Sequence, residues 1–219
     1  MPRIVLPIPV DRRLYRFAQL AVGLLLYGIS TSMLVLARLG LDPWDVLHQG
    51  LSRTFGMPIG TWAIIVSFAV LVCWWPLRMV PGIGTFANAV AVGLVMDVVL
   101  STVQPPHVLT VRIAMLLAAV MLNGIATGLY IGAGMGAGAR DGLSVGLAAH
   151  GYSMRIVRTS IELTVLIAGV LLGGTFGVGT VLYAVTIGPL THRIIPALAM
   201  PSVPPNAGGC DQASDHLGH

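Results

Sequence analysis

Long apolar runs alternate with short polar or glycine-rich segments along most of the chain. A helix that crosses the hydrocarbon core of a membrane needs about 20 mostly apolar residues. Six runs approach or exceed that length, at roughly 16–38, 59–77, 83–103, 111–135, 157–175 and 178–199. The pattern therefore predicts an all-α membrane protein with six transmembrane helices.

Two shorter helical segments, 43–55 and 139–151, follow the first apolar run of each half of the chain. A helix of this length is only about 20 Å long, too short to cross about 30 Å of hydrocarbon. The first segment is amphipathic, with Asp45 and His48 opposite its apolar stripe. Two alternatives stay open: a helix lying flat in the headgroup layer, or a re-entrant element that lines a polar cavity.

The two halves of the chain repeat each other. Residues 28–51 align without a gap with residues 124–147, and nine of the 24 positions are identical. The shift is 96 residues there, and a shift of 95 aligns Gly82-Ile83-Gly84-Thr85 with Gly177-Val178-Gly179-Thr180. Hydrophobicity alone would not place glycine, threonine and aspartate in register. Such a duplication is typical of many transporter folds.

We therefore expect repeat 1 at 14–104 and repeat 2 at 105–200, each with three transmembrane helices and one short helix. The segment 1–13 would be cytoplasmic and the tail 201–219 disordered. With the N-terminus inside, nine of the twelve arginines lie on the cytoplasmic side, as the positive-inside rule requires. Because three crossings are an odd number, the second repeat is inverted and both termini face the cytoplasm.

Composition supports a lipid environment. Only 9% of the residues are charged and 56% are apolar, whereas soluble domains carry about 25% charged residues. The two cysteines lie far apart and suggest neither a disulfide framework nor a metal site. All basic residues are arginines placed between apolar runs, which indicates membrane topology signals and not nucleic-acid binding. No cofactor is expected.

A glycine-rich segment, Gly132 to Gly138, leads into Arg140 and Asp141 at the start of the second short helix. Free N–H groups at a helix start, with an arginine beside them, suit a small anionic solute. Alternatively, glycines spaced by four form a close helix-packing face, and the two roles are compatible. We take Asp45, His48, Arg140 and Asp141 as the candidate solute site.

Four further ionisable residues lie within the apolar runs. Arg158 and Glu162 have the i,i+4 spacing that allows an ion pair, which is either structural or part of a gate. Asp97 and His192 are equivalent at the shift of 95. They could relay a proton or bind a solute, or they could mark the ends of the apolar stretches. These four are the candidate coupling or gating residues.

Several motifs carry a resemblance that covers most of residues 14–195. Pro43–Gly50 resembles the GPWDVLHQG segment of the YczE branch of the YczE/YyaS/YitT-like bacterial integral membrane proteins, and Gly138–Leu143 resembles its GPRDGL segment. Val157–Glu162 and Gly173–Thr180 resemble its VRTAIE and GGTxGxGT segments. The resemblance implies a small polytopic inner-membrane protein and supplies no catalytic residues.

This chain departs from that pattern at two positions, with Asp42 where the family often has glycine and Ala139 in place of proline. The duplication favours a transporter-like or solute-binding membrane protein of unknown substrate. The alternative is a non-transporting scaffold or assembly factor that holds a partner protein or a second copy. An enzyme ranks last, because no metalloprotease, nucleophile-elbow or paired-aspartate pattern stands in a suitable context.

Overall fold

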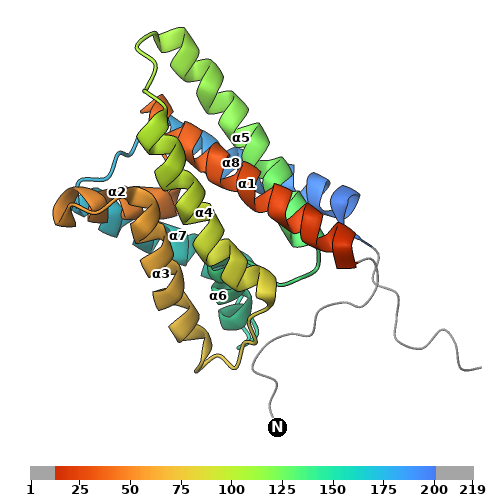
Figure 1. Cartoon of the computed structure of the whole chain (residues 1–219). Coiled ribbons are helices and arrows are strands. Elements are labelled where there is room, and N and C mark those ends of the chain that lie inside the picture. The colour runs from red at the N-terminus through yellow and green to blue at the C-terminus, as the bar shows by residue number, and fades with distance from the viewer. Residues whose placement is uncertain (1–12, 201–219) are drawn as a thin grey trace, which may run out of the picture.

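A computed structural model describes residues 13–200, and all of their regular structure is helical (Figure 1). The helices are α1 (Arg13–Ala37), α2 (Pro43–Phe55), α3 (Ile59–Trp74), α4 (Ile83–Thr102), α5 (Leu109–Gly132), α6 (Ala139–Ala148), α7 (Met154–Leu171) and α8 (Val178–Leu198). The expected disordered tail, and all but one residue of the expected cytoplasmic segment 1–13, lie outside the described residues.

Four helices, α1, α4, α5 and α8, are long and apolar enough to cross a membrane by themselves. Helices α2 and α3 pass that test only as a pair, and they are bent by 114° at the break between them. Helix α3 has only 16 residues, and the 18-residue α7 carries Arg155, Arg158 and Glu162. The described helices thus support four or five spans, and the sixth stays a prediction.

Local sequence sets the ends of the short helices. Asp42 precedes α2 and its carboxylate accepts a hydrogen bond from the Asp45 N–H at 2.8 Å, while Pro43 occupies the first helical position. Helix α6 ends at Ala148 instead of continuing to 151 as predicted. The chain turns there, and Gly151 has a φ of 96°, a left-handed conformation that ends helices.

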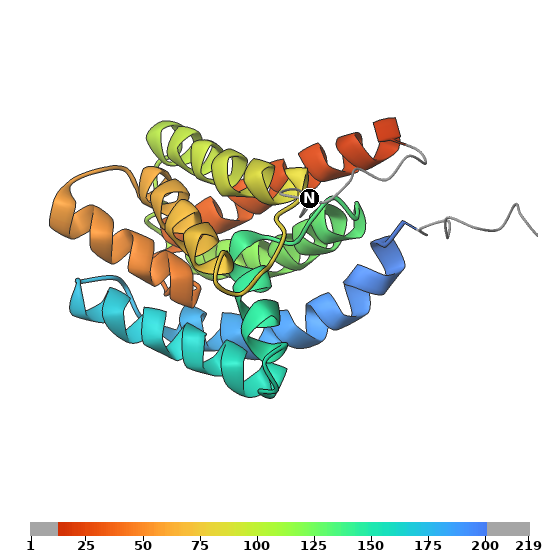
Figure 2. The same cartoon turned by 90° about the horizontal axis from the view of Figure 1, so that it is seen from below.

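Helices α1 and α5 pack against each other in an antiparallel pair (Figures 1 and 2). Near the start of α1, Arg16 donates to the Ala133 carbonyl just after α5, at 2.8 Å. Near the start of α5, Arg112 donates to the Ala37 carbonyl at the end of α1, at 2.7 Å. Arg16 and Arg112 correspond at the shift of 96, as do the two alanines. Each helix therefore supplies a cap for the other.

The turns after α1 and α5 make a second reciprocal contact. The Gly84 N–H at the start of α4 donates to the Met135 carbonyl at 2.9 Å. The Gly179 N–H at the start of α8 donates to the Leu39 carbonyl at 2.8 Å. These residues also correspond at the shifts of 95 and 96. The turn of each half is thus fixed to a helix start of the other half.

Most helix contacts recur at the corresponding place in the two halves. Helix α4 packs on α1 as α8 packs on α5, and α2 packs on α7 as α6 packs on α3. Helix α3 also packs closely along α4, but no comparable packing joins α7 to α8 among the described helices. The two halves therefore differ in how tightly their third and fourth helices meet.

Candidate functional site

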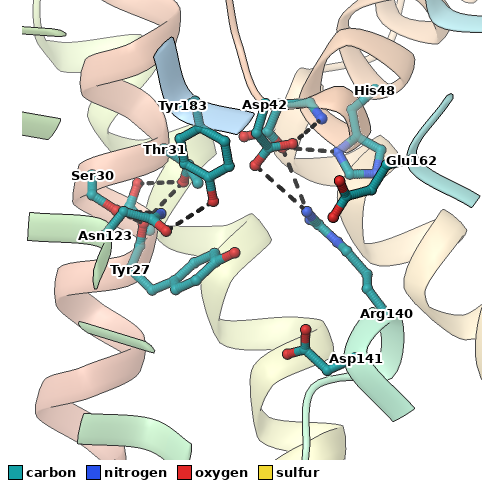
Figure 3. Close-up of polar contacts among 12 residues, drawn as sticks. Tyr27, Ser30, Thr31, Asp42, His48, Asn123, Arg140, Asp141, Glu162 and Tyr183 are labelled. Atoms are coloured by element: carbon teal, nitrogen blue, oxygen red, sulfur yellow. Dashed lines mark hydrogen bonds and ion pairs between the residues drawn. The ribbon is translucent and has the colours of Figure 1, made fainter. Parts of the chain in front are cut away.

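A cavity of about 70 Å³ lies where the two halves meet, and all eight helices contribute to its lining. The volume is the space open to the centre of a water-sized sphere, and on that measure one water needs about 10–15 Å³. The cavity can therefore hold several waters or one small solute. Figure 3 shows polar side chains of both halves facing one another in this region.

Corresponding positions of the two halves line this cavity in pairs. The pairs are Asp42 and Gly138, Trp44 and Arg140, Ala63 and Arg158, Ser67 and Glu162, and Asn88 and Tyr183. The cavity is therefore built from equivalent surfaces of the two halves. Its chemistry is not equivalent, because most of the charged members of these pairs belong to the second half.

The start of α2 supplies a buried acidic group. Asp45 and His48 have no exposed surface, and the His48 Nδ1 lies 3.1 Å from the Asp45 Oδ1. The Asp45 Oδ2 and the His48 Nε2 have no hydrogen-bond partner among the described residues. A helix lying flat in the headgroup layer would expose these groups to water. Their burial favours the alternative in which α2 lies inside the protein beside a polar cavity.

Arg140 extends from α6 toward this acidic group (Figure 3). Its Nη1 lies 3.9 Å from the Asp42 Oδ2, and its Nη2 lies 3.8 Å from the Asp45 Oδ1. Both distances exceed those of hydrogen bonds. The guanidinium also lies 5.5 Å from the centre of the Trp44 ring, within the range of a cation–π contact. Two carboxylates thus already face Arg140, which argues against an anionic solute there.

Asp141, the fourth predicted site residue, lines the cavity and is held by a tyrosine. The Tyr130 hydroxyl donates to the Asp141 Oδ2 at 2.6 Å, and Tyr27 packs edge-on against the Tyr130 ring. Tyr183 lines the cavity as well and donates to the Asn123 Oδ1 at 3.0 Å. These tyrosines were not predicted from the sequence, although an aromatic ring with a polar tip inside an apolar run is a usable signal.

Arg158 and Glu162 form the ion pair that their spacing predicts, with 2.8 Å between the Arg158 Nε and the Glu162 Oε1. Both line the cavity, yet their side chains are 49% and 31% exposed. The pair therefore lies at the open rim of the cavity. That position is compatible with the structural role and with the gating role.

Asp97 and His192 lie outside the cavity. Asp97 accepts hydrogen bonds from the Gly60 N–H at 2.7 Å and from the Thr61 hydroxyl at 2.8 Å. It therefore caps the start of α3 and ties that helix to α4. His192 is exposed on α8. The structure does not bring these two residues together with the other candidates.

Two further arrangements bear on chemistry. Within residues 13–200, no cluster of three or more His, Cys, Asp or Glu side chains is placed to hold a metal ion. Gly142-Leu143-Ser144-Val145-Gly146 has the Gly-x-Ser-x-Gly spacing, but the whole segment lies inside α6. A nucleophile elbow requires a sharp turn between a strand and a helix.

The sequence resembles proteins whose roles are not described. The profile of a "family of unknown function (DUF6198)" matches residues 14–196. An "uncharacterized protein" of Haemophilus influenzae is 36% identical over 187 residues, which cover 84% of this chain and 86% of that protein. The "uncharacterized membrane protein YczE" of Bacillus subtilis is 33% identical over 178 residues, covering 80% and 82%.

A third relative, the "uncharacterized protein YyaS" of Bacillus subtilis, is 25% identical over 189 residues, or 83% of this chain and 92% of that protein. These relatives confirm the resemblance to YczE-like proteins found in the sequence motifs. No solved structure matches the chain.

Proposed function

We propose that this membrane protein, which belongs to the DUF6198 family, binds a small solute between its two halves and carries it across the membrane. One observation carries the proposal: paired positions of the two halves enclose a cavity lined by charged side chains, among them the buried Asp42 and the partly buried Arg140 and Asp141. Burying charge inside a membrane protein is costly, so such groups typically mark the path of an ion or solute.

The reciprocal contacts support an inverted repeat. Helices α1 and α5 correspond in sequence and run antiparallel, and each is capped by an arginine of the other. A two-fold axis that relates antiparallel membrane helices lies in the membrane plane. Carriers built in this way bind their solutes near mid-membrane at the interface of the repeats. The arginine distribution would place both termini in the cytoplasm, with the protein in the inner membrane.

The difference between the two halves suggests how the cavity opens. A Cβ added at Gly93 of α4 would lie 2.4 Å from the Gly60 carbonyl oxygen of α3, so these helices are in backbone contact. The corresponding Gly188 of α8 has nothing within 4 Å of an added Cβ. We infer that the structure is closed between α3 and α4 and open between α7 and α8. In the alternate state, the two halves would exchange these arrangements.

Exposure of the cavity walls agrees with this assignment. Glu162 on α7 is 31% exposed, whereas the corresponding Ser67 on α3 is only 6% exposed. A carrier must expose both positions in turn, on opposite sides of the membrane. A non-transporting scaffold would keep Ser67 buried.

Cysteine accessibility tests the proposal. In a Cys73→Ser and Cys210→Ser background, Ser67→Cys and Glu162→Cys are each labelled in sealed vesicles with a membrane-impermeant thiol reagent. We expect both cysteines to react, from opposite sides of the membrane. Leu163→Cys is the matched control, because Leu163 is an exposed apolar neighbour of Glu162 that we expect to face lipid and to stay unlabelled.

Labelling of both cavity cysteines from one side would contradict the inverted arrangement. A Ser67→Cys variant that never reacts would favour the scaffold. We propose a carrying role and not an enzymatic one, because the Gly-x-Ser-x-Gly segment lacks the backbone turn that activates a nucleophile.

A further inference from the structure

The cavity has an excess of negative charge. Asp42, Asp141 and Glu162 line it, and the carboxylate of Asp45, which is not part of the lining, lies 3.8 Å from the Arg140 guanidinium. Two guanidinium groups, those of Arg140 and Arg158, stand against these four carboxylates. The formal charge of the group is therefore −2 when all its members are ionised. A solute with positive charge would reduce this excess, and one with negative charge would increase it.

Asp42 presents a carboxylate to the cavity. Its side chain is only 4% exposed, and its Oδ1 accepts the Asp45 N–H. Its Oδ2 lies 3.9 Å from the Arg140 Nη1, which is longer than a hydrogen bond. The buried Oδ2 of the neighbouring Asp45 has no hydrogen-bond partner among the described residues. A ligand that brings N–H donors into the cavity would make charge-assisted hydrogen bonds to the Asp42 carboxylate.

Aromatic rings line the cavity beside these carboxylates. They belong to Trp44, Tyr27, Tyr130 and Tyr183. The faces of such rings attract ammonium and guanidinium groups within about 6 Å. Arg140 already uses the Trp44 ring in this way, at 5.5 Å. A metal cation of the hard type would instead require a shell of oxygen ligands, whereas rings together with carboxylates suit an organic cation.

We infer that the solute is a small organic cation bearing an ammonium group, recognised by Asp42, Asp141 and the surrounding rings. This inference rests on the proposed function, because it names the substrate class of the same site. The cavity of about 70 Å³ limits the ligand to a few non-hydrogen atoms. Arg140, which makes no hydrogen bond to the carboxylates it faces, occupies part of the space as a resident cation.

The sign of the effect at Arg140 separates a cationic solute from an anionic one. Removal of its charge in Arg140→Gln leaves the carboxylates uncompensated, so an ammonium ion should bind more tightly, by about tenfold. An anionic solute would bind more weakly in the same variant. Asp42→Asn keeps the helix cap and the shape of the side chain, and should weaken ammonium binding by about tenfold.

The experiment measures binding to the purified full-length protein by titration calorimetry at constant ionic strength. The probes are ethylammonium, tetramethylammonium and acetate. We expect saturable binding of an ammonium ion and none of acetate. The control variant is Asp97→Asn, which removes the same charge outside the cavity while keeping a cap for α3, and it should leave the affinity unchanged.

Several outcomes would overturn the inference. They are the absence of ammonium binding, acetate binding that Arg140→Gln weakens, and equal losses of ammonium affinity in Asp42→Asn and Asp97→Asn. If Arg140→Gln does not fold, the difference in ammonium affinity between Asp42→Asn and Asp97→Asn decides whether the inference holds. The proposed function is tested separately, because a Ser67→Cys variant that reacts from the side opposite to Glu162→Cys supports a carrier whatever its solute is.

Discussion

Replacing Gly93 by alanine should destabilise the protein, whereas the same replacement at the corresponding Gly188 should not. Both glycines lie inside the fourth helix of their half, Gly93 in α4 and Gly188 in α8. A Cβ at Gly93 would lie 2.4 Å from the Gly60 carbonyl oxygen and 2.5 Å from Ile64. Helix α3 would have to move away, because its backbone cannot yield by rotating a side chain. At Gly188 the Cβ would meet no atom of another helix, and the adjoining Pro189 is the group that it crowds.

The magnitude follows from three contributions. Alanine is favoured over glycine inside a helix by about 1 kcal/mol. Overpacking at Gly93 opposes this by about 1–3 kcal/mol, and displacement of α3 would also weaken the hydrogen bonds that Asp97 makes to Gly60 and Thr61. At Gly188 the next residue, Pro189, disfavours the helical conformation of a residue that carries a Cβ and so offsets part of the helix gain. Gly93→Ala should therefore be less stable than wild type by up to about 2 kcal/mol, whereas Gly188→Ala should stay close to wild type.

The measurement is the free energy of unfolding in mixed micelles, obtained by titration with a denaturing detergent and followed by circular dichroism. Wild type, Gly93→Ala and Gly188→Ala are compared under identical conditions. A Gly93→Ala variant that is as stable as wild type would refute the backbone contact between α3 and α4.

Two further predictions concern the alternate state and the crossed caps. Gly188→Leu should leave the described packing of the other helices in place, because none of their atoms lies within 4 Å of an added Cβ, but it should obstruct the approach of α7 to α8. A Ser67→Cys label would then be lost while Glu162→Cys still reacts, and unchanged labelling of both would contradict the exchange of arrangements. Arg112→Gln removes the guanidinium that donates to the Ala37 carbonyl and should lower the free energy of unfolding by about 1 kcal/mol. The same titration measures this change. An unchanged free energy of unfolding would show that water replaces the arginine at this carbonyl.

Much of the architecture could be predicted from the duplicated pattern. Gly40 and Gly136 align in the two halves, and both have a positive φ, of 122° and 124°. A Cβ at either position would lie 2.7 Å from the hydroxyl oxygen of a threonine in the other half, Thr180 or Thr85. The glycine and the threonine therefore recur in both halves, because in each contact one half supplies the glycine and the other supplies the threonine. The start of α2 could be predicted as well, because Asp42 followed by Pro43 is a local signal for the start of a helix.

The electrostatics of the site could not be predicted in the same way. Arg140 was expected to attract an anion because its neighbours along the chain are glycines and a helix start. Its neighbours in space include Asp42 and Asp45, almost 100 residues earlier in the chain. Only tertiary packing decides which charges face one another. The difference between the halves has a similar origin, because Gly60 in α3 corresponds to Arg155 in α7, whose side chain hinders a backbone contact.

The crossed arginine caps constrain how the chain is completed during synthesis. Helix α1 leaves the ribosome long before Arg112 is made, so its final carbonyl at Ala37 has to remain without that donor until the second half arrives. A first half expressed alone would never meet Arg112. The equivalent donor would be Arg16 from another copy of the first half, lying upside down beside it. A gene of half this length would consequently need to insert its product in both orientations, and fusion of two such genes would remove that requirement.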